Sequence, residues 1–71
     1  MKATAIFVQG PEPDINRDGD EIPKWYVFAG DDDGEAVGKT YECGSRQKAI
    51  DLAERMADDR RLPIEDESSD A

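Results

Sequence analysis

The side chains of this chain that could take part in chemistry are almost all carboxylates. Of its 71 residues, 18 are Asp or Glu and 9 are Lys or Arg; there is no His, and the net charge is −9. Cys43 is the single thiol, and Lys39, four residues before it on the same face of the predicted strand, is the residue that would lower its pKa. A half-buried packing role is more common for such a Cys. Because no nucleophile has a partner base, we expect no enzymatic activity and no cofactor.

One stretch has the spacing of a metal-binding loop. Asp14, Asn16 and Asp18 alternate along the chain, and Gly19 allows a sharp bend after them, so their oxygens can converge on one hard cation. The stretch 14–22 resembles the first half of an EF-hand-type calcium loop. The weak candidate ligands that this resemblance implies are Asp14, Asn16, Asp18 and Asp20.

The same stretch departs from the calcium motif at important positions. Trp25 stands where the motif has a bidentate Glu, and Pro11 and Pro13 exclude a long incoming helix. We therefore interpret the stretch as a solvated, Asx-rich turn and predict no metal site.

The negative charge is concentrated in three segments. Residues 10–23, 31–35 and 63–71 each carry a net charge of −4, and the rest of the chain is slightly basic. Such a surface repels nucleic acid and anionic membranes and attracts basic proteins. We therefore predict that a basic protein surface is the partner, bound by Asp14, Asp18, Asp20, Glu21, Asp31, Asp32, Asp33 and Glu35.

The elements that would position these carboxylates are three strands and a helix. Residues 2–9, 24–29 and 35–43 are rich in β-branched and aromatic residues, and the Gly-Asp-Asp-Asp-Gly turn at 30–34 predicts a hairpin between the last two. Residues 10–23, with three prolines among charges, are typical of a long loop.

A helix is predicted from Arg46 to Arg61. Ser45 is a suitable N-cap, apolar residues recur on one arc of the helix, and Pro63 ends it. We expect an α+β fold: one domain over 1–64, with a three-stranded antiparallel sheet and one C-terminal amphipathic helix on one face. Residues 65–71 have no apolar anchor, and we expect them to be a disordered acidic tail.

One helix covers only one face of such a sheet, yet strand 24–29 is apolar on both sides. We expect Ile15 and Ile22 of the long loop to cover the second face. The alternative is a partner chain on that face, including a second copy in a homodimer.

In size and charge the chain resembles small acidic phage-encoded inhibitors of the anti-CRISPR type. Carboxylates two residues apart on an extended strand are about 6.6–7 Å apart, similar to neighbouring phosphates. The resemblance implies a nucleic-acid mimic that blocks a basic surface of a nucleic-acid-binding complex, and such binding weakens with added salt.

The alternative function is that of a small ββα module from an acidic proteome, acting through a dimer or partner contact on the free sheet face. The stretch from Lys24 to Met56 also resembles small bacterial modules with an aromatic strand, a Gly turn, a second strand and an Ala-rich helix. Residues 1–9 lack a signal-peptide pattern and no apolar run is long enough for a bilayer, so we expect a cytoplasmic protein.

Overall fold

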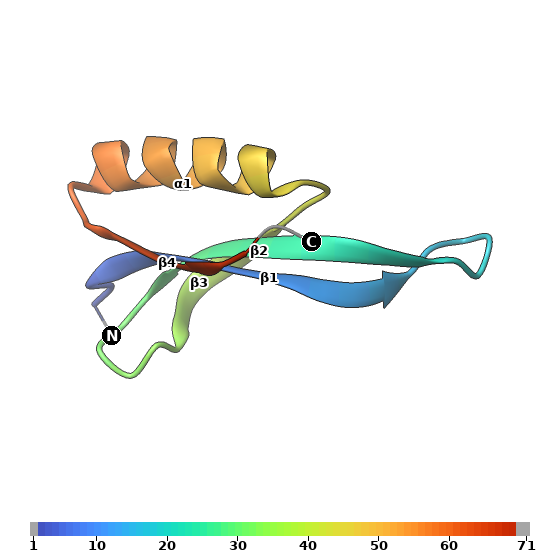
Figure 1. The fold of residues 1–71 in the computed structure, drawn as a ribbon. Coiled ribbons are helices and arrows are strands. Elements are labelled where there is room, and N and C mark those ends of the chain that lie inside the picture. The colour runs from blue at the N-terminus through green and yellow to red at the C-terminus, as the bar shows by residue number, and fades with distance from the viewer. Residues whose placement is uncertain (1, 70–71) are drawn as a thin grey trace.

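The computed structural model describes residues 2–69, which form a mixed four-stranded sheet with one helix packed on it (Figure 1). The strands are β1 (Ala5–Ile15), β2 (Glu21–Gly30), β3 (Ala36–Cys43) and β4 (Ile64–Ser68), and the helix is α1 (Arg46–Arg60). The predicted α+β class is confirmed. The prediction of three antiparallel strands is wrong, because a fourth strand pairs in parallel with β1.

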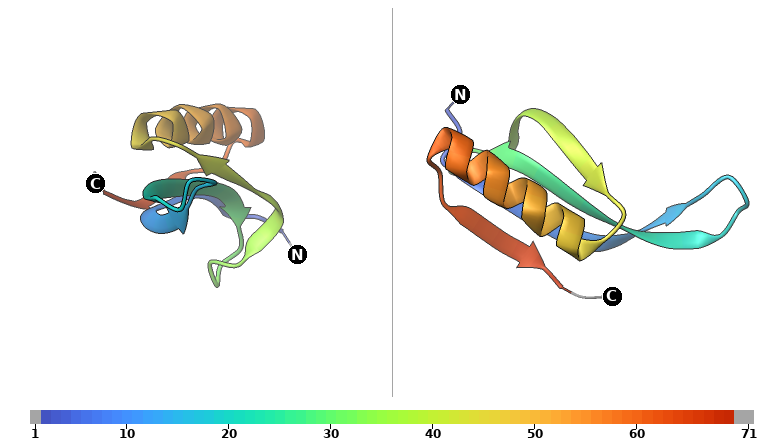
Figure 2. Two further views of the ribbon diagram at one scale, coloured as in Figure 1. Left: turned by 90° about the vertical axis from the view of Figure 1, so that its right-hand side faces the viewer. Right: turned by 90° about the horizontal axis from the view of Figure 1, so that it is seen from above.

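The strands lie in the order β3-β2-β1-β4. The pairs β1–β2 and β2–β3 are antiparallel, so β3 and β4 run in the same direction at opposite edges of the sheet. The helix α1 connects them by crossing over the sheet (Figure 2, right). A crossover is needed because a tight hairpin joins only antiparallel strands.

The core lies between α1 and one face of the sheet. Ile6, Val8 and Val27 of the two central strands are fully buried there, and so are Ala49 and Ala53 of the helix. Because Ala has a short side chain, these two positions let the helix backbone approach the sheet closely. Burial of these apolar groups, at about 25 cal/mol per Å², is the main force that holds the two layers together.

Both ends of α1 follow from local signals. The Ser45 hydroxyl accepts a hydrogen bond from the Lys48 amide at 3.2 Å, which confirms the predicted N-cap. At the other end Arg61 adopts the left-handed conformation, and the Leu62 amide donates to the Ala57 carbonyl at 3.0 Å.

The segment 10–23 is not the long loop that was predicted. The pairing of β1 with β2 continues past a bulge after Gln9 to the pair Ile15–Glu21, which leaves a connecting loop of residues 16–20. We call residues 11–24 the arm. Prolines are tolerated in it because each strand of a two-stranded ribbon has a free edge, where a missing N–H leaves no ladder bond unmade.

The second face of the sheet is not covered as expected. Ile15 is 63% exposed near the end of the arm instead of packing on the sheet. The β2–β3 hairpin bends toward the side away from α1 (Figures 1 and 2). We call the sheet face opposite α1 the open face.

The acidic segment after Pro63 is ordered as far as the structure describes it. Residues 64–68 form β4, in register with β1 from the pair Ile6–Ile64 to the pair Gly10–Ser68. The expectation of a disordered tail is therefore wrong for residues 65–69, and residues 70–71 lie outside the described part. This segment has few apolar side chains to hold it in place, and it is anchored instead by backbone pairing with β1.

Candidate protein-binding surface

The predicted partner-binding residues are divided between the two ends of β2. Asp14, Asp18, Asp20 and Glu21 lie at the end of the arm, whereas Asp31, Asp32, Asp33 and Glu35 lie at or beside the β2–β3 turn. The ten residues of β2 separate the two groups by about 30 Å, at about 3.3 Å per residue, in a molecule 38 Å long. The two groups therefore do not form a single site.

The loop at the end of the arm is organised by Asn16. Its side-chain oxygen accepts hydrogen bonds from the amides of Asp18 (3.0 Å) and Asp20 (2.9 Å), and its own amide donates to the Asp20 carbonyl. Gly19 takes the positive φ of 84° that the turn requires. Within residues 2–69, no group of three or more Asp, Glu, Cys or His side chains is placed to hold a metal ion. The loop has the geometry of the Asx-rich turn inferred from the sequence.

Asp31 has a structural role in the turn at the other end of β2. It is only 5% exposed, and its Oδ1 accepts hydrogen bonds from the amides of Asp33 (2.9 Å) and Glu35 (3.1 Å). Asp31 is therefore not displayed at the surface, although the prediction of a partner-binding carboxylate assumed that it was. The side chains of Asp32, Asp33 and Glu35 remain exposed.

The open face carries an aromatic centre. Residues paired across neighbouring strands point to the same face, and one such row runs through Phe28 and Phe7 to Glu65. The two Phe rings stack with centroids 5.3 Å apart and an angle of 14° between their planes. Phe28 is buried and Phe7 is half-buried, so part of this apolar surface is accessible.

The next row places Tyr26 between carboxylates. It runs from Glu42 on β3 through Tyr26 and Gln9 to Glu67 on β4. The Gln9 amide nitrogen donates to the Glu67 carboxylate at 2.9 Å, which fixes these two side chains beside each other. At about 4.8 Å per strand, the row is about 14 Å wide with an acid at each end.

The arm extends the negative charge of this row. Glu12 and Asp14 lie on the same face, opposite Lys24 and Ile22. The pKa of the Tyr26 hydroxyl is raised, first by burial and then by the charges of Glu42, Asp14 and Glu12. Carboxylates from β3 and from the arm therefore create a shared negative potential at the Tyr26 oxygen.

The strand β4 is held in place by contacts on the helix side. Arg46 donates from Nη2 to the Asp66 carboxylate at 2.8 Å and from Nε to the Ser68 hydroxyl at 3.0 Å. Ser68 also donates to Asp66 from its amide and its hydroxyl, and the Trp25 indole N–H donates to the Ser69 carbonyl at 3.1 Å. Since Asp66 points toward the helix, its neighbours Glu65 and Glu67 must point to the open face.

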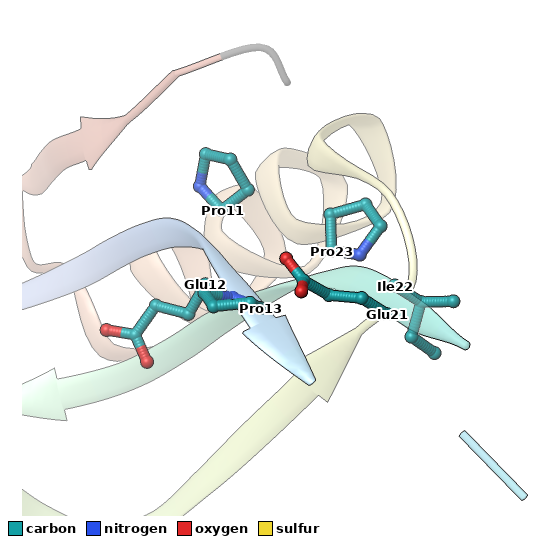
Figure 3. A pocket seen from close by; sticks show the side chains of 6 residues that line it. All are labelled: Pro11, Glu12, Pro13, Glu21, Ile22 and Pro23. Atoms are coloured by element: carbon teal, nitrogen blue, oxygen red, sulfur yellow. The ribbon is translucent and has the colours of Figure 1, made fainter. Parts of the chain in front are cut away.

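The arm also has a shallow depression of about 310 Å³ (Figure 3), lined by Pro11, Glu12, Pro13, Glu21, Ile22 and Pro23. In Figure 3 the rings of Pro11 and Pro23 project to one side of the arm and the carboxylate of Glu12 to the other. Glu21 lies on the same side as Pro23, and an apolar ring beside a carboxylate suits the aliphatic stem and the charged end of a Lys or Arg side chain.

The geometry gives Cys43 no activated thiol. Its pKa is raised, chiefly by burial, with Lys48 acting weakly in the opposite direction. Lys39, the expected activating residue, instead has its Nζ 5.2 Å from the centre of the Tyr41 ring. A protonated thiol is a poor nucleophile, so Cys43 is better explained as a packing residue, as expected.

Several residues of the open face were not among the predicted site residues, notably Tyr26, Glu42, Glu65 and Glu67. The alternation in 35–43 does place Glu42 on one strand face, and strand 24–29 does show an unassigned apolar face. The sequence alone does not reveal the strand register that brings Glu42 and Tyr26 together, nor the fourth strand that adds Glu65 and Glu67.

No helix among residues 2–69 combines the length and the apolar character needed to cross a membrane. Comparison with protein-family models, with curated proteins and with solved structures finds no match to this chain.

Proposed function

We propose that this protein is a non-catalytic, acidic module that binds a basic protein surface. The observation that carries this proposal is where the carboxylates point. The salt bridge between described residues, Arg46–Asp66, lies on the helix side of the sheet. Among residues 2–69, the carboxylates on the open face therefore have no ion pair, and their charge remains available to a partner.

The spacing of these carboxylates supports a more specific partner class. Glu12 and Asp14, and likewise Glu65 and Glu67, are two residues apart on one face of a strand. Their backbone separation of about 6.6–7 Å is similar to that of neighbouring phosphates. The basic surface of a nucleic-acid-binding complex therefore fits the module best, in line with its resemblance to small acidic phage-encoded inhibitors.

Salt-dependent binding to a basic peptide tests the electrostatic part of this proposal. The probe is a fluorescein-labelled, arginine-rich peptide, and the control probe has Gln in place of every Arg. We expect binding of the arginine-rich probe alone, weakened by about tenfold or more between about 50 mM and about 200 mM salt. Absence of binding at low salt, or affinity independent of salt, would contradict the proposed function.

The nucleic-acid-mimic part has its own test. A DNA-binding protein that the module binds is loaded with labelled duplex DNA, and the module is titrated into the complex. We expect the DNA to be released in direct competition. Binding of the module without release of DNA would restrict the function to a basic surface unrelated to nucleic acid.

A further inference from the structure

We infer that the open face is the docking surface for an arginine-bearing segment of the basic partner, with one guanidinium group on Tyr26 beside Glu42 and a second arginine directed at Glu67. This inference rests on the proposed function and specifies its site and the chemical group that is recognised.

The aromatic part of the face favours an arginine over other cations. Tyr26 is half-buried on the same face as the stacked rings of Phe7 and Phe28, so the centre of the face is aromatic. A guanidinium is planar, stacks on aromatic faces and is more weakly hydrated than an ammonium group. A lysine would satisfy the charge of the site but would stack less well on its aromatic rings.

The acids at the edges of the face supply the hydrogen-bond acceptors. Glu42 and Glu67 lie in one row with Tyr26 on opposite edge strands, one and two strands away from it. Both side chains are exposed, and a guanidinium presents a fork of N–H donors that matches a carboxylate. A guanidinium on Tyr26 therefore lies within reach of Glu42, while a second arginine is needed to reach Glu67 fully.

The electrostatic potential at the centre of the face has the sign that a cation requires. The phenol of Tyr26 resists ionisation partly because Glu42, Asp14 and Glu12 are near it. The same potential that disfavours a phenolate favours a positive charge at that place. Lys24, opposite Glu12, is the one cation that the register places on this face of residues 2–69, and it marks the limit of the site toward the arm.

Other occupants of the face are disfavoured by the same charges. A nucleic acid strand would bring phosphates toward Glu12, Asp14, Glu42, Glu65 and Glu67. A second copy of the chain would place the same acids against each other. The arm does not fold over the face, as the exposure of Ile15 shows.

Binding of two peptides to matched variants tests this site. The probes are fluorescein-labelled peptides of equal length and charge, one with arginines and one with lysines, each titrated into the full chain at low salt. The test variant is E42Q/E67Q. The control is E54Q/D58N, which makes the same charge change on exposed helix residues.

We expect E42Q/E67Q to weaken arginine-peptide binding about tenfold and the control to change it less than about twofold. We expect Y26L to remove the preference for arginine over lysine while circular dichroism shows the fold intact. Equal loss in E42Q/E67Q and E54Q/D58N would overturn the site and leave the proposed function standing. Failure of the wild-type chain to bind either peptide would instead overturn the proposed function.

Sedimentation of the wild-type chain provides a second measurement. We expect a monomer. A dimer that Y26L converts to a monomer would show that a second copy occupies the open face, and would overturn the inference.

Discussion

At the scale of single residues, Tyr26 reports the negative potential of the open face. Burial and three carboxylates on two different elements raise the pKa of its hydroxyl. Removal of one of these charges should therefore change that pKa measurably.

We predict that E42Q lowers the pKa of Tyr26 toward the ordinary tyrosine value, because it removes the largest repulsive charge acting on the phenolate. The measurement is tyrosinate absorbance against pH in a Tyr41→Phe background, where Tyr26 is the remaining tyrosine. E54Q, on the exposed helix surface, is the control and should leave the titration unchanged. An unchanged pKa in E42Q would mean that Glu42 does not face Tyr26.

Gly30 determines the position of the Phe7 ring. A Cβ at residue 30 would lie 2.5 Å from the Phe7 ring, closer than two carbon atoms can approach, and 3.2 Å from the Phe28 ring, which is a tight contact. The ring of Phe7 therefore occupies space that the absent side chain leaves free.

We predict that Gly30→Ala lowers the free energy of unfolding by about 1–3 kcal/mol, because the new methyl group must displace an aromatic ring from its stack. Gly44→Ala is the matched control: its Cβ meets nothing within 4 Å, and we expect a change within about 0.5 kcal/mol. Chemical denaturation measures both. Equal stabilities of the two variants would refute this explanation of Gly30.

At the scale of elements, β4 depends on a polar cluster rather than on apolar side chains. The Asp66 carboxylate accepts from Ser68 and pairs with Arg46, and these contacts hold its pKa below the ordinary value, with the Ser68 hydrogen bonds contributing most. The ionised form of Asp66 is thus favoured by folding.

We predict that Asp66→Asn destabilises the protein by about 1 kcal/mol at neutral pH, a modest value because the pair is partly exposed. The stability that the carboxylate contributes is fully present above the ordinary aspartate pKa of about 3.9 and is lost as the pH falls through the lower folded-state value. The gap between wild type and variant should therefore shrink below about pH 4. Thermal unfolding against pH checks this, with Glu65→Gln on the same strand as the control.

The elements that could be predicted from the sequence are those with local causes. Ser45 and Pro63 predict a helix from Arg46 to Arg61, and the observed helix ends one residue earlier, at Arg60. The Asp-Gly turn at 30–34 joins two strands as expected. The fourth strand could not be predicted, because its order comes from pairing with β1 and from Arg46, which lies 20 residues before Asp66. The arm was missed because prolines argue against a strand inside a sheet but not in a two-stranded ribbon.

The candidate binding surface could likewise be predicted only in part. Charge density correctly indicated an exposed acidic surface at Asp18, Asp20, Asp32 and Asp33. It could not indicate that Asp31 is buried by its own turn, or that Glu42 and Glu67 lie in one row. Those facts depend on which residue is opposite which, and a one-residue shift of register would move every side chain of a strand to the other face.

At the scale of the whole molecule, a net charge of −9 on 71 residues makes the folded state repel itself. Salt screens that repulsion, and it also screens attraction to a basic partner. Folding and binding should therefore respond to salt in opposite directions.

We predict that the thermal midpoint of the free protein rises by about 4–8 °C between low and physiological salt, equivalent to about 1 kcal/mol for a chain of this size. Over the same range the affinity for an arginine-rich peptide falls. Differential scanning calorimetry in sodium chloride, repeated in a neutral osmolyte at equal osmolality, separates screening from general solvent effects. A midpoint that falls with salt would show that attractive ion pairs, not repulsion, dominate the fold.

The placement of β4 beside β1 has a consequence for biosynthesis. The Gln9–Glu67 hydrogen bond joins residues 58 positions apart, so the sheet remains incomplete until residue 67 has left the ribosome. Until then β1 presents an unpaired edge beside its apolar side chains, a form that attracts other strands. Glu65 and Glu67 thus close the vulnerable edge of the nascent protein and complete its acidic face at the same moment.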